Sequence, residues 1–373
     1  MSGRIAIRPA RTGDDPGLKA LLRDLPFAGT VRLSLEREPS FFTAAAVEGS
    51  PHHAFVGDAG DGRLAGLFTR AVRPVWLDGE PARLGYLGQL RKAPGVVLSR
   101  RHLRQGFAAC EATRTADELP FDLTSIVADN APARKLLERG LPGLPVYRPW
   151  TELVTVAIAA ARRPRPLPAG VRRADAELLP TVARRLAGEL SRRQLAPAWN
   201  PVNLSRCPDL AASDFLVTVE HDHGGPRVTG CLALWDQRSF KQTVVRGYAP
   251  WLARLRPLLA PALRLAGRPA LPPPGRALAM GFLSHEAVPL DQPEELLTLV
   301  EGARRLAAGR GIELVVLGLT RQDPRLSLLL RRLPARTYDS VLYLVHPRSS
   351  GAERAAAAAA GSNRPPHAEV ALL

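Results

Sequence analysis

The feature that most constrains the fold of this chain is a pattern that restarts after a proline-rich segment. Residues 161–169 carry a proline at every second position from 164 to 168, and such a segment can hold neither a helix nor an inner strand. Similar residues recur on either side of it at one spacing. Ile7-Arg8-Pro9-Ala10 corresponds to Val171-Arg172-Arg173-Ala174, and Gly66 corresponds to Gly230, in both cases 164 residues later. An internal repeat of this length predicts two similar structural units.

A second set of correspondences supports the repeat. Pro132, Leu136, Leu137 and Arg139 correspond to Pro324, Leu328, Leu329 and Arg331, which follow 192 residues later. The difference of 28 residues is nearly the length of an extra segment at 248–274. We therefore expect an N-terminal domain over 1–160, a linker over 161–169, a C-terminal domain over 170–347 and a flexible tail over 348–373. Two unrelated α/β domains are the alternative interpretation.

Hydrophobic periodicity predicts the same order of elements in both halves. Alternating apolar residues indicate strands, whereas apolar residues three or four positions apart indicate helices. The first half is expected to read strand, helix, hairpin pair, strand, helix, strand, helix, strand, and the second half repeats this order. Such an order predicts an α/β (α+β layered) fold, in which each domain has a mixed, mostly antiparallel sheet flanked by helices.

Composition excludes several classes of protein. No apolar run approaches the roughly 20 residues needed to cross a bilayer, and the N-terminus enters a strand pattern without an apolar signal segment. The three cysteines, Cys110, Cys207 and Cys231, are far apart and form no CxxC pair. We therefore expect a cytoplasmic protein with no transmembrane segment and no metal site.

The net charge of +16 raises the question of nucleic-acid binding. The basic residues are spread over both halves instead of gathering in one arm, and aromatic residues that could stack on bases make up only 5% of the chain. Nucleic acid is therefore not expected as the main partner. The segment Trp251–Arg268 alternates leucines with arginines, and we expect it to form a lid that packs on the second domain in preference to a helix on a membrane surface.

One stretch of the first half resembles a known family. Residues 129–140 read Asp-Asn-Ala-Pro-Ala-Arg-Lys-Leu-Leu-Glu-Arg-Gly, which is similar to the Asn-x-x-Ala-x-x-Leu-(Leu/Tyr)-Glu-x-x-Gly pattern of the GNAT (Gcn5-related N-acetyltransferase) superfamily. In this stretch Asn130 can cap the helix that follows. The opening Ile7-Arg8-Pro9-Ala10 and the order of elements also resemble that family. The chain therefore looks like a tandem-domain member with degenerate motifs.

The resemblance implies a binding site for the pyrophosphate of an acyl-CoA. In the family the phosphates lie on a (Gln/Arg)-x-x-Gly-x-(Gly/Ala) loop and the start of the third helix, where unpaired amides favour an anion. The matching stretch here runs from Gln89 to His102, with Leu98 and Arg100 where glycines usually stand. The residues expected to bind the cofactor are Gln89, Leu90, Arg91, Leu98, Ser99, Arg100, Arg101 and Asn130.

The resemblance also implies a set of catalytic residues in the first half. Glu36 and Glu38 follow the first helix, where the family often lines its acceptor cleft, and they are candidate bases. Tyr147 follows the fourth helix, where many members keep a tyrosine that protonates the leaving thiolate. In the second half the matching stretch, 284–293, has no glycine and carries three acidic or acceptor side chains, Glu286, Asp291 and Gln292, so that half is expected to be degenerate. His285 and Glu286 could still form a site in a second cleft.

The function expected from this resemblance is transfer of an acyl group from acyl-CoA to an amine. N-acetylation from acetyl-CoA is the first expectation, and another acyl-CoA is possible. The acceptor would be a small molecule or a peptide. A non-catalytic protein that kept the fold to bind a ligand or a partner is the alternative, because the phosphate loop departs from the family pattern.

Overall fold

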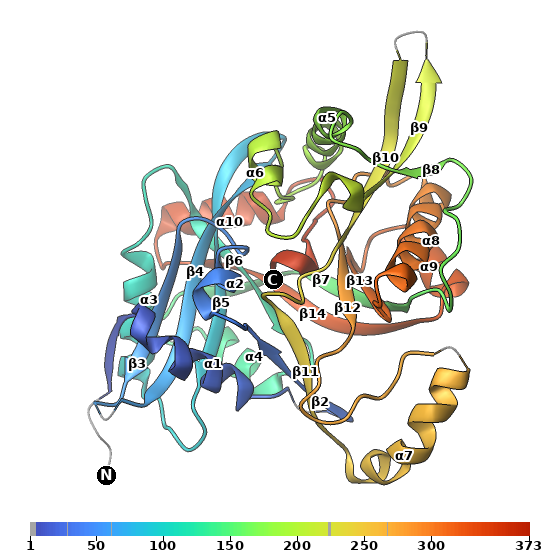
Figure 1. The fold of residues 1–373 in the computed structure, drawn as a ribbon. Coiled ribbons are helices and arrows are strands. Elements are labelled where there is room, and N and C mark those ends of the chain that lie inside the picture. The colour runs from blue at the N-terminus through green and yellow to red at the C-terminus, as the bar shows by residue number, and fades with distance from the viewer. Residues whose placement is uncertain (1–4, 28, 61, 223–224, 267) are drawn as a thin grey trace.

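A computed structural model describes residues 5–27, 29–60, 62–222, 225–266 and 268–373 (Figure 1). Within these residues twelve strands form one mixed sheet, in the order β1-β3-β4-β5-β6-β14-β7-β13-β12-β10-β9-β8. A separate two-stranded sheet pairs β11 with β2. Helices lie on both faces of the large sheet, so the predicted α/β fold class is confirmed.

The first half supplies the elements up to β7. They are β1 (Ala6–Pro9), η1 (Thr12–Asp14), α1 (Asp15–Arg23), β2 (Val31–Glu36), α2 (Phe41–Ala45), β3 (His52–Asp58), β4 (Leu64–Leu77), β5 (Glu80–Lys92), α3 (Arg100–Glu111), β6 (Glu118–Val127), α4 (Ala131–Glu138) and β7 (Val146–Ala159). The strand β2 was not predicted from the sequence, which indicated only a segment after the first helix.

The second half supplies the remaining elements. They are β8 (Val171–Arg173), α5 (Leu179–Leu190), α6 (Pro201–Ser205), η2 (Ala212–Asp214), β9 (Phe215–Asp222), β10 (Gly225–Trp235), β11 (Gln242–Tyr248), α7 (Pro250–Leu265), β12 (Met280–Ser284), α8 (Pro293–Gly309), β13 (Leu314–Thr320), α9 (Leu326–Arg332), β14 (Ala335–His346), α10 (Ser350–Ala360) and η3 (Val370–Leu372).

The two halves exchange strands at the centre of the large sheet. The last strand of the second half, β14, pairs antiparallel with β6 of the first half, with Val345 opposite Asp122. The last strand of the first half, β7, pairs with β13 of the second, with Thr320 opposite Leu153. Because β14 and β7 also pair with each other, the sheet runs without a break through both halves. The boundaries at 160 and 170 therefore remain a prediction.

Helices cover opposite faces of the first half of the sheet. Side chains of adjacent strand residues point to opposite faces, and Leu67 and Phe68 of β4 show which helix lies on each. Leu67 packs with α1 and α2 in one hydrophobic cluster, whereas Phe68 lies against Gly106 of α3. On the Leu67 side, Ala44 of α2 packs with Trp235 and Phe240 of the second half, so α2 lies between the two halves.

The predicted flexible tail is wrong. Residues 350–360 form α10, whose alanines at 352, 356 and 359 are buried, and His367, Ala371 and Leu372 are also buried. The chain ends near the middle of the molecule (Figure 1). The alanine-rich helix packs on the sheet because small side chains allow close approach, a feature that composition alone did not reveal.

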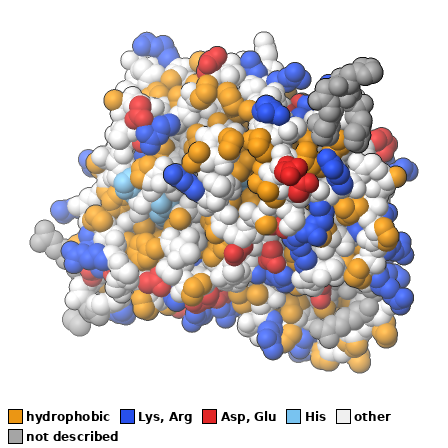
Figure 2. Space-filling view, turned by 45° about the horizontal axis from the view of Figure 1, so that its top comes forward, with side chains coloured by type: hydrophobic (Ala, Val, Ile, Leu, Met, Phe, Trp, Pro, Cys, Tyr) orange, Lys and Arg blue, Asp and Glu red, His pale blue; other side chains and the backbone are white. Residues whose placement is uncertain are grey.

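No helix in the described ranges is long and apolar enough to cross a membrane. The basic side chains on the face drawn in Figure 2 are scattered among other residues and form no single stripe.

Truncating Leu372 tests the packing of the C-terminal segment. This side chain is 3% exposed, so Leu372→Ala should lower the free energy of unfolding by about 2 to 5 kcal/mol through lost burial and a residual cavity. Urea unfolding measures the change, and Val202→Ala, at a residue 55% exposed, is the control and should change it little. Equal stability of the two variants would mean that the segment is loose.

Candidate functional site

The parallel strands β5 and β6 pair over only part of their length. Their register runs from Arg83 opposite Glu118 to Tyr86 opposite Leu123, although β5 continues to Lys92 and β6 to Val127. Beyond Tyr86 the two backbones are therefore not paired with each other. We call this end of the pair the β5–β6 fork. A threonine borders it, because the Thr124 hydroxyl donates to the Leu87 carbonyl at 2.6 Å.

A β-bulge lies on β5 at the fork. Thr69 of β4 is opposite Gly88 and Leu67 is opposite Arg91, so Gln89 and Leu90 together oppose one residue. A bulge of this kind leaves a backbone amide outside the ladder and redirects it. Gln89 has a φ of 52°, which is unusual for a residue with a side chain, and its Oε1 is buried without a hydrogen-bond partner. The bulge therefore brings unsatisfied polar groups to the fork.

Two helices begin at this edge of the sheet. Because β5 and β6 run parallel, α3 and α4, which follow them, both start where the strands end. Ser99 caps α3 by accepting from the His102 amide, and Asn130 caps α4 by accepting from the Ala133 amide at 3.3 Å. Arg100 and Arg101 in the first turn of α3 are exposed. Free amides and the helix dipole make such an edge favourable for a phosphate.

Arg91 and Leu98 are directed elsewhere. The Arg91 guanidinium lies 4.9 Å from the centre of the Phe27 ring, and burial lowers the pKa of Arg91 to about 10. A Cδ atom of Leu98 lies 3.6 Å from the position a Cβ would take at Gly66 of β4. Leu98 therefore packs on the sheet, and neither side chain joins the exposed arginines at the start of α3.

A buried carboxylate that the sequence analysis missed lies beside the bulge. Glu48 is 2% exposed, and its Oε2 is 3.7 Å from the position a Cβ would take at Gly88. Its Oε1 accepts a hydrogen bond from Arg37, and its Oε2 is 3.4 Å from His52 Nε2. Burial opposes ionisation of Glu48, but the charges of Arg37 and His52 lower its pKa to about 2. This carboxyl group is therefore ionised at neutral pH.

Glu48, Arg37 and His52 lie in a buried cluster of charged groups between the halves, which we call the seam. Lys241, Arg73 and Tyr86 also belong to it. Burial lowers the pKa of Lys241, which precedes β11, to about 8, and its Nζ donates to the Leu373 carbonyl at 2.8 Å. The Arg73 guanidinium lies 4.7 Å from the centre of the Tyr86 ring. Arg37 Nη1 and Arg73 Nη2 are buried without hydrogen-bond partners. The seam is therefore rich in donors, and no sequence motif marks it, since its members come from both halves.

The predicted bases Glu36 and Glu38 point away from the seam. Arg23 Nε is 3.8 Å from Glu36, and Arg23 Nη2 is 3.2 Å from Glu38, so both carboxylates lie on the side of α1. Arg37, between them, points the opposite way to Glu48, as alternation along an extended segment requires. Glu36 also pairs with Arg246 of β11.

Tyr147 lies at another level of the sheet. One row of paired residues runs across four neighbouring strands. It joins Tyr147 of β7, Val345 of β14, Asp122 of β6 and Gly85 of β5. The ring therefore lies four residues before the bulge along β5. It packs 6.1 Å from Phe107 and 6.0 Å from Tyr343, and burial raises the pKa of Tyr147. A cavity of about 230 Å³ nearby is lined by residues that include Leu87, Arg104 and Phe107.

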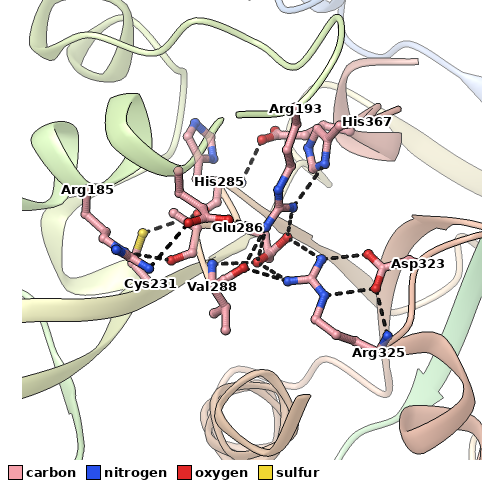
Figure 3. Close-up of polar contacts among 12 residues, drawn as sticks. Arg185, Arg193, Cys231, His285, Glu286, Val288, Asp323, Arg325 and His367 are labelled. Carbon is pink, nitrogen blue, oxygen red and sulfur yellow. Dashed lines mark hydrogen bonds and ion pairs between the residues drawn. The ribbon is translucent and has the colours of Figure 1, made fainter. Parts of the chain in front are cut away.

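The second half contains a matching fork. Its parallel strands β12 and β13 pair from Met280 opposite Leu314 to Leu283 opposite Leu317, and His285, just beyond β12, has a φ of 53°. At the end of this strand pair, where the first half has its fork, a network of buried ion pairs fills the space (Figure 3). Glu286 accepts from Arg193 Nη1 at 2.6 Å and from Arg325 Nη1 at 2.8 Å, and Arg325 also binds Asp323.

The C-terminal segment closes this second fork. The His285 amide donates to Glu369 Oε1 at 3.1 Å, and Trp199 Nε1 donates to the same oxygen. Burial raises the pKa of Glu369 to about 7. A Cβ at Gly318 of β13 would clash with Val370. The remaining cavity of about 370 Å³ is lined partly by Arg193, Gln322 and residues of the 360–368 segment. The amide that could have faced a ligand is therefore already paired.

Comparison with solved structures decides the fold. Saccharomyces cerevisiae N-myristoyltransferase with bound myristoyl-CoA superposes with a TM-score of 0.58 at 10% identity, over 92% of this chain and 83% of that chain. The chain has the GNAT fold. A GCN5-related N-acetyltransferase from Sphaerobacter thermophilus matches this fold with a TM-score of 0.52 at 16% identity, over 91% and 95% of the two chains.

A third structure matches over only part of its length. It is described as a GCN5-related glucosamine N-acetyltransferase region in a fungal multi-domain β-N-acetylglucosaminidase. The TM-score is 0.56 at 14% identity, and the match covers 92% of this chain and 38% of that chain. No protein-family model matches the sequence, and no curated protein sequence matches it. At these identities the likeness concerns the fold alone.

Removing Glu286 tests whether the ion network holds the second half together. Glu286→Ala should lower the free energy of unfolding by about 3 to 5 kcal/mol, because it removes the buried carboxylate that Arg193 and Arg325 share. Asp117→Ala, which breaks an exposed pair with Arg83, should leave the urea midpoint almost unchanged. A Glu286→Ala midpoint as high as that of the control would contradict the assignment.

His285 should contribute to acid sensitivity. Burial lowers its pKa from 6.5 to about 3, so between these values the unfolded chain binds a proton that the folded chain does not, and stability falls as the pH falls. His285→Asn keeps a residue that tolerates positive φ and removes this proton. We expect its melting temperature to fall less than that of the wild type between pH 7 and pH 4.5. Parallel curves would contradict the buried neutral histidine.

Proposed function

We propose that this chain is an acyl-CoA-dependent N-acyltransferase and that its first half binds the acyl-CoA. The observation that carries the proposal is the β5–β6 fork with its bulge at Gln89 and Leu90. The fold is shared with N-acyltransferases, one of which holds myristoyl-CoA. The unpaired Gln89 Oε1 and the two helix starts at one edge suit a ligand that combines amide groups with phosphates.

The residues at the fork divide the work of binding. Bound acyl-CoA would supply a thioester, whose carbonyl carbon is the electrophile. The start of α3, with Ser99, Arg100 and Arg101, would hold the phosphates, and the Asn130 cap would border them. A backbone amide released by the bulge would donate to the developing oxyanion, a role that needs a donor held in place beforehand.

Glu48 is the acid group that we assign to the acceptor amine. It lies beside Gly88, one residue from the bulge. Since its pKa is about 2, the carboxylate would hold the ammonium form of the acceptor by charge. The ammonium would lose one proton to water before its nitrogen attacks the thioester carbon, and as the C–S bond breaks the second nitrogen proton would go to the leaving thiolate. Glu36 and Glu38 are less suitable, because both face Arg23 on the other side of the segment.

The second half would shape the acceptor side of the site. Lys241 and the C-terminal segment reach the seam from the second half, and the ion network leaves its own fork filled. We assign a small molecule or a peptide amine as the acceptor, and acetyl or another acyl group as the group transferred. A non-catalytic ligand-binding protein is the alternative that the following experiments separate from this proposal.

Thermal stability measures binding at the first fork. Acetyl-CoA and myristoyl-CoA at millimolar concentration should raise the melting temperature, because a ligand that binds the folded state stabilises it. The double variant Arg100→Glu/Arg101→Glu should need at least a tenfold higher ligand concentration for the same shift in melting temperature, because the new carboxylates repel the phosphates at the helix start. Arg172→Glu, an exposed position in the second half, is the control. No shift in the wild type with either ligand would reject acyl-CoA binding.

Glu48→Gln tests the chemical assignment. With a panel of amines, release of free thiol from acyl-CoA should fall at least tenfold, because the variant removes the charge that holds the acceptor ammonium. The acyl-CoA shift in melting temperature should persist, because Glu48 lies on the acceptor side. Glu38→Gln should keep the activity. Binding of acyl-CoA without turnover for any amine would favour the non-catalytic alternative.

A further inference from the structure

Helix α7 carries an exposed apolar stripe. Nine large hydrophobic side chains are exposed among the described residues, and four of them belong to this one helix: Trp251, Leu255, Leu258 and Leu265. Leu258 is 74% exposed and Leu265 is 89% exposed. With Ala262, which is also exposed, they stand four, three, four and three positions apart. This spacing places all five on one side of a helix.

The stripe is separate from the side by which α7 packs on the protein. Leu252 is 7% exposed and packs with Val245 and Tyr248 of β11. Leu259 lies on the same side of the helix as Leu252 and packs against the same cluster. The helix stands apart from the large sheet at the lower right of Figure 1. The predicted packing of this segment on the second half is therefore present, through β11, whereas its action as a lid stays a prediction.

The charged residues of α7 and of the segment that follows it are all arginines. No Asp or Glu occurs between residues 249 and 285, whereas five arginines do, at 254, 256, 264, 268 and 276. Arg254 and Arg268 are exposed, and Arg256 donates to the Leu271 carbonyl at 3.3 Å. An apolar stripe with a Trp, in a segment that has arginines and no Asp or Glu, has the composition of helices that lie in the headgroup region of a bilayer.

We propose that α7 docks this protein on an anionic lipid surface, with the stripe from Trp251 to Leu265 buried among acyl chains and the arginines on lipid phosphates. A second copy of the chain is a poorer occupant, because pairing two α7 stripes would bring arginines together without a carboxylate. Pro257 and Pro261 within the helix also disfavour a long coiled-coil contact. The proposal is independent of the acyl-transfer proposal and concerns a different surface.

Vesicle flotation with the full chain tests the proposal. The wild type should float with vesicles of phosphatidylcholine and phosphatidylglycerol in equal amounts. It should remain at the bottom of the gradient when the vesicles contain phosphatidylcholine alone. A protein with a net charge of +16 would be attracted to anionic vesicles by charge alone, so the decisive variant keeps the charge. Trp251→Ser/Leu258→Ser should lower partitioning at least tenfold, because it removes apolar area from the stripe.

The matched control is Val202→Ser/Leu330→Ser, which removes two exposed apolar side chains outside α7. It should partition within twofold of the wild type, and the melting temperatures of all three proteins should agree. Equal flotation of the α7 variant and the wild type would overturn the proposal in favour of diffuse charge, and absence of flotation would also overturn it. Sedimentation velocity supplies a further arm, since a dimer that the α7 variant alone converts to monomer would make the stripe a subunit contact instead.

Discussion

The exchange of β7 and β14 at the centre of the sheet is the constraint on which the rest of the structure depends. Each half ends in a strand that pairs with the other half, β14 with β6 and β7 with β13. Neither half can complete its ladder of backbone hydrogen bonds alone, and unpaired ladder groups in a buried sheet are costly. The exchange therefore joins the two halves through long rows of paired backbone groups. The small β2–β11 sheet joins them a second time, with Glu36 opposite Gln242.

The two forks show how one backbone arrangement can have opposite chemical environments. In both, a parallel pair loses its register next to a residue with positive φ, Gln89 or His285. At the first fork Gln89 keeps an unpaired oxygen and the border is a threonine hydroxyl. At the second, the His285 amide is bound to Glu369, and Glu286 joins two buried arginines. An anionic ligand would have to displace these buried carboxylates, whose desolvation is already compensated.

The seam beside the first fork concentrates charges that neither half would bury alone. Glu48 and Arg37 come from the first half, and Lys241 comes from the second. Buried charges are tolerated when partners lie close, and their pKa values move accordingly, down for Glu48 because of Arg37 and down for Lys241 because of burial. Such a site depends on the assembled halves, so its chemistry is a property of the whole chain.

The sequence alone determined the features that depend on local physics. Periodicity and turn residues predicted most strands and helices of the large sheet, although not β2 or β11, and Asn130 was predicted to cap α4, as it does. The repeat predicted two related halves. Only the tertiary structure decided which side chains meet, because Glu48, Lys241 and Glu369 lie far apart in the sequence and no local pattern links them. It also decided that the alanine-rich end is a packed helix and that α7 exposes Leu255, Leu258 and Leu265, since burial depends on what lies opposite each face and not on the composition of the segment itself.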